Sequence, residues 1–497
     1  VVSNRWPDHR CYWRLNRSEV VVALWRSDCA WLRDVAEIRF DFSLDHAGTR
    51  RDVNTVSVSA SPVILWFRRD LRVRDHQALE RALSVGPVVP LFIVDPAFDR
   101  AGGPRRAALA AALHDLRQAT EGALVIRRGR PATVLTDMVK TLGVSEVHVS
   151  RDYGPYGHGR DAEVAAALRE VGCRFIGTGS PYLVAPGGVL KDDGSPYSVF
   201  TPFRKRWRLT LDASESVLND APSNPDWVSI DDIGDLLDQH VENLVDDELT
   251  ELSSERVTRR WATFARDGLH HYSDVRDLPA VDGTSRMSTA LRFGVVHPAR
   301  LLQELDPTSE HHSTFESELA WRDFYADVLF RRPDSAWANL DTKLNGIAID
   351  TDGAARTRFE IWAQGMTGFP IVDAGMRQLA ATGWMHNRVR MIAASFLVKD
   401  LHLPWQWGAK WFMQHLVDAD LASNNHGWQW AAGTGTDAAP YFRVFNPTAQ
   451  AERWDPAGEY QRRWIPELNS DRYPVPMVDH GEERKEALRR YEAARAR

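Results

Sequence analysis

Paired asparagines and two tryptophans stand together in the stretch NNHGWQWAAGTGTDAAPYF, residues 424–442. A core helix would carry Leu, Ile and Val there, and a plain surface loop would not carry two indoles. Asp418 and Asp420 precede this stretch, and Arg390 lies on a predicted helix upstream. Arg390 and Asp418 could form a buried pair beside a heteroaromatic ring, while Asp420 and Asn424 meet the N–H and C=O groups of the ring edge.

A second polar group lies in PAVDGTSRMSTALRFG, residues 279–294, where a glycine turn leads into hydroxyl side chains at the expected start of a helix. Hydroxyls and unpaired backbone N–H groups at a helix start form a seat for an anion, and Arg286 adds positive charge. The alternative is an ordinary helix N-cap by Thr284 or Ser285.

Two further helical segments could place polar and aromatic side chains on one face. In ESELAWRDFY, the spacing of Glu318, Trp321 and Arg322 predicts a shared face, although a surface ion pair beside a core tryptophan is the alternative. In GWMHNRVRM, His386 could act as an acid or base, but a single His in a helix is usually packed. The same segment forms one helical stripe from Trp384, Asn387 and Met391.

The most basic run is PFRKRWR, residues 202–208, and Arg443, Arg462 and Arg463 add charge further along. Cations interleaved with aromatic rings suit a phosphate backbone beside a stacking surface. A solvated charged segment is the alternative for 202–208.

Composition limits the classes of protein that can contain these groups. The chain has 497 residues and a net charge of −7, so two or three domains are expected and any nucleic-acid affinity must be local. Its three cysteines lack metal-ligand spacing, which indicates neither a disulfide framework nor a metal site and favours a reducing cytoplasm. No apolar run reaches the length of a membrane span. Of 19 tryptophans, 11 follow residue 320, which favours a ligand that stacks or, alternatively, a large helical core.

The elements that must position these side chains fall into two classes. Short apolar runs at 63–67, 88–94, 123–126, 146–150 and 173–177 alternate with segments of helical period. This alternation predicts a doubly wound, parallel, five-stranded α/β domain, without either of the usual glycine-rich phosphate motifs. The expected organisation is a poorly ordered extension at 1–60, the α/β domain at 61–190, an acidic linker at 191–255 and an all-helical domain at 256–497.

Taken in order, six segments resemble the photolyase/cryptochrome family, from about Pro62 to about Leu468 and most densely from 284 to 447. They are VILWFRRDLRVRDHQAL, GTSRMS, ESELAWRDFY, TGFPIVDAGMRQLAATGWMHNRVRM, SFLVKDL and DADLASNNHGWQWAAGTGTDAAPYFRVFNP. The subtype resembles bacterial cyclobutane pyrimidine dimer photolyases. The resemblance implies an enzyme that acts on UV-damaged DNA. We expect a monomeric, cytoplasmic protein with no membrane attachment and no obligate protein partner.

The resemblance also implies that FAD is bound in the helical domain. The phosphate and ribose side would be held by Tyr272, Thr284, Ser285, Arg286, Met287, Ser288 and Arg322. The isoalloxazine would be surrounded by Asn387, Arg390, Asp418, Asp420 and Asn424. Asn424 falls where the family places the residue that faces flavin N5. Photolyases have Asn at this position and plant cryptochromes have Asp, so the choice favours repair over signalling.

For the substrate, the resemblance implies a flipped-out dimer in a cavity beside the flavin. Trp321 and Trp430 would sandwich the dimer, Glu318 would hydrogen-bond it, and Met391 would line the cavity. Asn387 and Arg388 would lie at the edge of the cavity. Flanking phosphates would be met by Arg276, Arg388 and Arg443. Excited FADH⁻ would donate an electron that splits the cyclobutane ring and then returns, so no side chain need act as a nucleophile.

Two accessory functions of the family are only partly matched. For flavin photoreduction, Trp428 and Trp405 match the inner and middle tryptophans, but the outer position reads Asp350, Thr351 and Asp352. Trp362 or Trp337 could substitute there.

Folate-binding members carry an Asn-Glu pair after the fourth strand, where this chain has Tyr156 and Gly157. Folate is therefore disfavoured, a deazaflavin antenna is expected, and no antenna is the next alternative.

Two rivals resemble this pattern less. A (6-4) photolyase would carry a second His where Asn387 follows His386. A cryptochrome-type blue-light sensor would more often carry a long C-terminal extension.

Overall fold

The structure, a computed structural model, describes residues 61–213, 217–230, 252–436 and 443–496. The extension predicted at 1–60 lies outside the described residues. The first described element is a five-stranded sheet with strand order β3-β2-β1-β4-β5, in which every neighbouring pair is parallel. Its strands are β1 Val63–Phe67, β2 Val88–Val94, β3 Val125–Arg128, β4 Glu146–Val149 and β5 Arg174–Gly177. The doubly wound sheet predicted from the sequence is confirmed.

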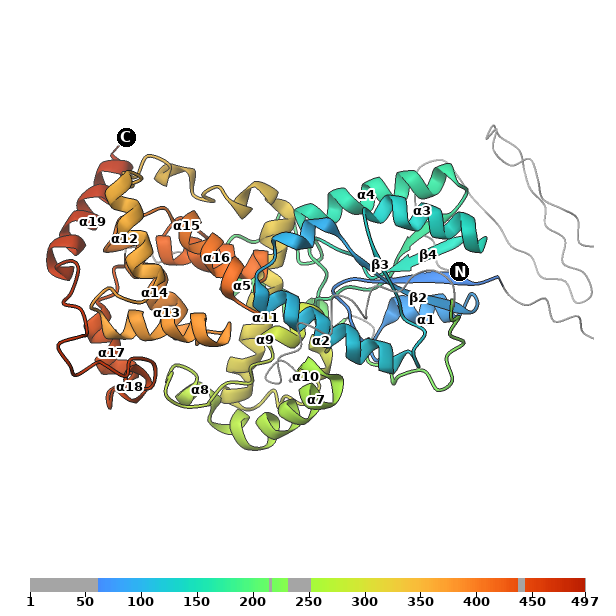
Figure 1. The fold of residues 1–497 in the computed structure, drawn as a ribbon, viewed down its shortest axis with the longest axis horizontal. Coiled ribbons are helices and arrows are strands. Elements are labelled where there is room, and N and C mark those ends of the chain that lie inside the picture. Colours follow the sequence, from blue (N-terminus) through green and yellow to red (C-terminus); the bar gives the residue numbers. More distant parts are fainter. Residues whose placement is uncertain (1–60, 214–216, 231–251, 437–442, 497) are drawn as a thin grey trace, which may run out of the picture. The chain divides into compact units, whose positions relative to one another are not determined.

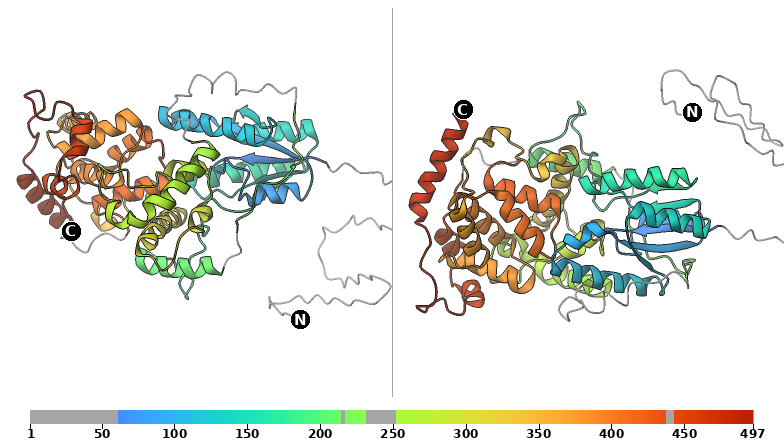
Figure 2. Two further views of the ribbon diagram at one scale, coloured as in Figure 1. Left: turned by 90° about the horizontal axis from the view of Figure 1, so that it is seen from below. Right: turned by 45° about the horizontal axis from the view of Figure 1, so that its top comes forward.

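Helices cover both faces of this sheet, as Figure 1 and Figure 2 show. Helices α1 (Gln77–Leu83) and α2 (Gly103–Ala119) pack on the face that carries Val63, Leu65 and Phe67. Helices α3 (Pro131–Leu142) and α4 (Pro155–Glu170) pack on the opposite face, which carries Ile64 and Trp66. Because side chains alternate along a strand, a run that is apolar at every position is buried on both faces.

The described chain from residue 252 onward contains helices and turns and no strand. Its longer helices are α7 Ser254–Thr263, α11 Glu310–Arg331, α12 Gly353–Ala363, α13 Pro370–Thr382, α14 Asn387–Lys399, α15 Trp405–His415, α16 Leu421–Ala432, α17 Pro447–Trp454 and α19 His480–Arg495. The shorter ones are α8 Tyr272–Val275, α9 Ser288–Phe293, α10 Pro298–Leu302 and α18 Glu459–Trp464. Helices α13 to α16 share one apolar core, which contains Trp362 and Trp428.

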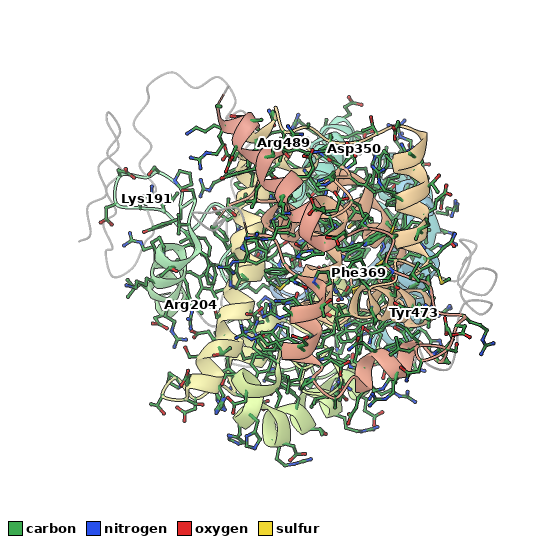
Figure 3. All side chains as sticks on the ribbon, turned by 90° about the vertical axis from the view of Figure 1, so that its left-hand side faces the viewer. Lys191, Arg204, Asp350, Phe369, Tyr473 and Arg489 are labelled. Carbon is green, nitrogen blue, oxygen red and sulfur yellow. The ribbon has the colours of Figure 1, made fainter. Side chains whose placement is uncertain are left out.

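Part of the range predicted as a solvated linker is a packed helix, α5 (Phe200–Asp212). Its basic run is amphipathic: Phe203 and Trp207 are buried against α11, and Trp207 Nε1 donates to Asp323 over 2.9 Å. Arg204, labelled in Figure 3, donates to Ser313 and Glu316 of α11. Some of the arginines of α5 thus hold this helix against α11. The basic composition of the segment did not indicate this packing role.

The loop after β1 contacts the helical region closely at Gly294, the residue after α9. Gly294 has a φ of +71°, and a Cβ there would collide with the backbone of Arg69 and Asp70. The Leu71 N–H also donates to the Phe293 carbonyl over 3.2 Å. Only glycine fits this approach, which carries Arg69 toward the helices of the candidate site.

Candidate functional site

The Arg390–Asp418 pair expected from the sequence is present. Arg390 projects from α14 and donates to Asp418 over 2.9 Å and to the Met385 carbonyl over 2.8 Å. The Asp418 side chain is 3% exposed, and its second oxygen, Oδ1, is buried without a hydrogen-bond partner among the described residues. A buried carboxylate oxygen without a partner is costly, so this site is suited to a ligand that carries an N–H or O–H group.

Asp420 is the N-cap of α16 and accepts from the Ser423 N–H over 3.1 Å. It also pairs with Arg69 over 2.5 Å, which joins the loop after β1 to the helices. Burial opposes ionisation of Asp420, but the cations of Arg69, Arg292 and Arg322 outweigh it and hold its pKa well below the usual range. Asp420 is therefore a fixed anion and acceptor at neutral pH.

Asn424 lies one turn further along α16, and its Nδ2 donates to the Ala409 carbonyl of α15 over 3.1 Å. Trp428 follows one turn later and is 2% exposed. Its ring packs against Gly408 so closely that a Cβ at that position would overlap it. The sequence places Asn424, Trp428 and Asp420 along one face, and the α15 contact fixes that face.

The TSRMS segment enters α9, which is only six residues long. Met287 occupies the N-cap position and no side chain caps the helix, so the alternative of an N-cap by Thr284 or Ser285 is wrong. Ser285 Oγ instead accepts from the Met287 N–H, and Arg260 donates to the Ser285 carbonyl over 2.9 Å. Arg286 and Ser288 are exposed, and Tyr272 is buried.

Two ion pairs join α11 to α14 through the dipeptide Arg276-Asp277. Arg276 pairs with Glu318 of α11 over 2.8 Å, and Arg388 of α14 pairs with Asp277 over 2.7 Å. The sequence predicted Arg276 and Arg388 as phosphate contacts, and the structure shows both engaged by carboxylates. Glu318 therefore pairs with Arg276 rather than with Arg322, its neighbour on the same helical face.

Trp321 and Arg322 face different surroundings. Trp321 stacks on Phe200 of α5, with ring centroids 3.7 Å apart and planes inclined by 10°. Arg322 donates to the carbonyls of Pro181 and Leu291 and lies 4.5 Å from the Tyr182 ring centroid. Trp321 is thus backed by a ring on one face, and Arg322 ties α11 to two other segments.

A cavity of about 720 Å³ opens beside α14 and α16. Its lining includes Arg388 and Met391 from α14, Trp430 from α16, and Arg443. Residues not expected from the sequence complete it: Asp277, Val444, Phe445, Asn446, Gln450, Arg453 and Trp454. Four of the residues that the resemblance implies as contacts of the DNA substrate therefore line the same cavity.

Other expected residues are not part of this lining. Trp321, Glu318 and Asn387 lie outside it, and Asn387 is exposed at the first turn of α14. His386 precedes it as the N-cap, and its Nδ1 accepts from the Arg388 N–H. Burial lowers the pKa of His386 to about 4, so the ring is neutral at pH 7 and is packed rather than poised as an acid.

Two of the three cations that neutralise Asp420, Arg69 and Arg292, were not predicted from the sequence. Arg69 lies in the segment FRRDLR after β1 and donates to Asp420. Arg292 lies in α9 and donates to the Ala419 carbonyl over 2.7 Å. Burial largely accounts for a lowered pKa of Arg292. Two arginines in segments of strong resemblance were a usable signal, but their partner is more than a hundred residues away in sequence.

Comparison with known proteins identifies the family. The family model described as DNA photolyase matches residues 63–225, and that described as FAD binding domain of DNA photolyase matches residues 315–493. The deoxyribodipyrimidine photo-lyase of Vibrio cholerae is 36% identical over 471 residues, which cover 87% of this chain and 99% of that protein. This chain belongs to the DNA photolyase family. The photo-lyase of Escherichia coli is likewise 36% identical, with coverage of 87% and 98%.

Solved structures of other photolyases and of a cryptochrome share the fold. A class III photolyase from Agrobacterium tumefaciens superposes with a TM-score of 0.81 at 33% identity, covering 90% of this chain and all of that one. A photolyase from Sulfolobus tokodaii with two FAD molecules gives a TM-score of 0.74 at 27% identity, with coverage of 87% and 100%. The Synechocystis cryptochrome gives 0.77 at 25% identity, with coverage of 86% and 99%.

The described part of this photolyase contains no candidate membrane-spanning helix. None of the helices there combines the length and the apolar character that a membrane span requires.

Proposed function

We propose that this photolyase repairs cyclobutane pyrimidine dimers in DNA, with light as the energy source and FAD as the cofactor. One observation carries the proposal: the same two packed helices, α14 and α16, hold both halves of the site. On the cofactor side they carry Arg390 and Asn424, and on the cavity side they carry Met391 and Trp430. Rigid elements shared in this way keep the ring and the substrate at a fixed separation.

The residues of the cofactor side fit a flavin. Asp418 Oδ1 supplies a buried acceptor, Asp420 a fixed anion and Asn424 an amide, and these suit the alternating N–H and C=O groups of an isoalloxazine edge. When bound and reduced, FAD supplies the electron that opens the cyclobutane ring after light is absorbed. The phosphate and ribose side remains assigned to Tyr272, Thr284, Ser285, Arg286, Met287, Ser288 and Arg322.

The cavity side fits an extruded dinucleotide. Trp430 and Met391 offer an apolar wall, and Arg443 at the rim offers a cation for a backbone phosphate. Trp321 and Glu318 remain our proposal for the opposing contacts, because the Arg276-Asp277 ion pairs hold α11 and α14 together at this point. We propose a monomer that needs no protein partner and acts in the cytoplasm, where a reducing environment suits the free Cys173.

The direct test gives purified, reduced protein a dimer-containing oligonucleotide under blue light. We expect the absorbance of the restored pyrimidines to return in the light and not in the dark. Recovery only with (6-4) damage, or with neither lesion, would reject the proposed substrate.

An antenna chromophore is proposed for a second cavity, of about 420 Å³, in the sheet domain. Asp95, Arg130 and Tyr156 line it after the carboxyl ends of β2, β3 and β4, where open α/β sheets bind ligands. The Tyr156 hydroxyl donates to Asp95, another of the lining residues. No Asn-Glu pair is available at Tyr156 and Gly157, so we propose a deazaflavin rather than folate.

The second FAD in the Sulfolobus tokodaii photolyase supports a flavin-like ring in such an antenna. We expect denaturation to release two chromophores, FAD and a deazaflavin, which absorbance and chromatography identify. Tyr156→Trp, which fills the cavity mouth, should lose only the deazaflavin, whereas release of folate would contradict this assignment.

A further inference from the structure

One face of α14 does more than line the cavity. Arg388, Met391, Ser395 and Lys399 are spaced by three, four and four residues, so they follow one stripe of the helix. The first two line the cavity. The last two lie beyond it and contact the segment that forms its opposite wall.

That segment is Arg443 to Asn446, which enters α17. All four of its residues line the cavity, and α17 then adds Gln450, Arg453 and Trp454. Ser395 Oγ accepts from the Phe445 N–H over 3.4 Å, and the Lys399 ammonium donates to the Arg443 carbonyl. The described wall is thus attached to α14 by its backbone at two neighbouring points.

Lys399 is an unusual residue for this position. The residue is 4% exposed, and lysine is rarely buried to this degree unless it is paired. Asp400, the next residue, is 1% exposed and accepts from His480 Nδ1 over 2.5 Å, while His402 pairs with Glu483 over 2.7 Å. A methionine would fill the same space without the desolvation of an amine, so packing alone does not account for lysine.

We propose that Lys399 is a positioning residue for damage binding: by holding the backbone of Arg443, it sets that guanidinium at the rim of the cavity to meet a DNA phosphate. The inference rests on the proposed function, because Arg443 has a phosphate to meet only if the cavity takes damaged DNA. Lys399 itself is not among the residues that line the cavity.

The charges around Lys399 couple this role to pH. Burial lowers its pKa to about 7, Asp400 opposes the shift, and Arg443 adds to it. A phosphate bound at Arg443 cancels that repulsion, so the pKa of Lys399 rises in the complex and binding takes up a proton. Affinity therefore falls as pH rises from about 7 to 9, by up to about tenfold for each unit of pKa change.

The test compares wild type with Lys399→Met, Lys399→Gln and a matched control, Lys410→Met, which removes an exposed lysine of α15. Two quantities are measured: the Kd for a dimer-containing duplex in the dark, at several pH values, and the repair per absorbed photon at saturating DNA.

We expect Lys399→Met to raise Kd by about tenfold, a loss of about 1.4 kcal/mol, with repair per photon unchanged. Lys399→Gln keeps an N–H donor but cannot titrate, so it should retain most of the affinity and lose the pH dependence between about 7 and 9. Lys410→Met should match wild type.

Wild-type affinity in Lys399→Met, or an unaltered pH profile in Lys399→Gln, would overturn the inference while leaving the proposed function intact. If Lys399→Met does not fold, the pH profile of Lys399→Gln decides. Failure of wild type itself to bind the lesion would instead reject the proposed function.

Discussion

Replacing Asp420 with alanine is expected to lower the free energy of unfolding by about 3 kcal/mol, near the lower end for one partner of a buried ion pair. The lower end applies because the pair is partly accessible, with Arg69 25% and Asp420 17% exposed. The loss has two physical parts: Arg69 keeps its charge without a partner, and α16 loses its N-cap. Thermal or denaturant unfolding of the purified protein measures it.

The pH dependence of this effect has a definite sign. The pKa of Asp420 is lower in the folded state than in the unfolded state, where it is about 4. The contribution of Asp420 to stability is therefore complete above about pH 4. It is lost progressively as pH falls from there toward the lower pKa of the folded state. The difference between wild type and Asp420→Ala should therefore be constant at neutral pH and shrink in acid. Asp220→Ala, which removes a carboxylate that is 90% exposed, should change stability by less than about 0.5 kcal/mol. Equal effects of the two substitutions would contradict the central position of Asp420.

Photoreduction of the oxidised protein is expected to slow by about tenfold or more in Trp405→Phe, because phenylalanine is harder to oxidise and each 1.4 kcal/mol added to a barrier costs a factor of ten. Trp405 Nε1 donates to Asn339 over 2.9 Å, and the next residue, Gln406, donates to the carbonyl of Trp337 over 3.2 Å. The segment that contains Trp337 and Asn339 thus contacts both Trp405 and Gln406.

We predict that Trp337, rather than Trp362, is the outer tryptophan of this route. The last member must release its proton to water and regain an electron from a reductant in solution, such as a thiol. Trp337 is 47% exposed, whereas Trp362 is fully buried against Trp428 with ring centroids 6.1 Å apart. Trp337→Phe should slow photoreduction as Trp405→Phe does, and Trp411→Phe should not.

Light-driven loss of the oxidised-flavin absorbance gives the rate, and transient absorption of the indole radical gives a second readout. If Trp405→Phe photoreduces as fast as wild type, the route through Trp405 is excluded. If only Trp405→Phe is slow, the electron leaves through another outer residue.

The sequence predicted those features that depend on local pattern. Short runs of strand length alternate with segments of helical period, and the parallel sheet followed from five such runs. The first run, VILWF, is apolar at every position, which is typical of a strand covered on both faces. Arg390, Asp418 and Asn424 were found because the two motifs that contain them are long and specific. Because Arg390 and Asp418 carry opposite charges, the sequence also predicted that they pair, and the structure shows this pair over 2.9 Å.

Other features depend on tertiary contacts that no local pattern contains. The run PFRKRWR is basic, but Trp207 buries its ring and donates to Asp323, and burial raises the pKa of that carboxyl to about 6. The ion pairs of Arg276 with Glu318 and of Arg388 with Asp277 could not be predicted, because these partners are brought together only when α8, α11 and α14 are packed. Contact of these two arginines with DNA phosphates stays a prediction. Lys399 lies in the segment SFLVKDL, yet only its burial distinguishes it from an ordinary helix-end lysine.

The measurement that tests the central claim most directly is repair of a dimer-containing oligonucleotide by the reduced, purified protein under blue light, compared between wild type and Trp430→Ala. We predict light-dependent recovery of pyrimidine absorbance by wild type. Trp430→Ala should weaken lesion binding by about 1–3 kcal/mol, the range for loss of one stacking aromatic. Purified protein that binds no flavin, or that leaves the dimer unchanged in the light, would contradict the claim.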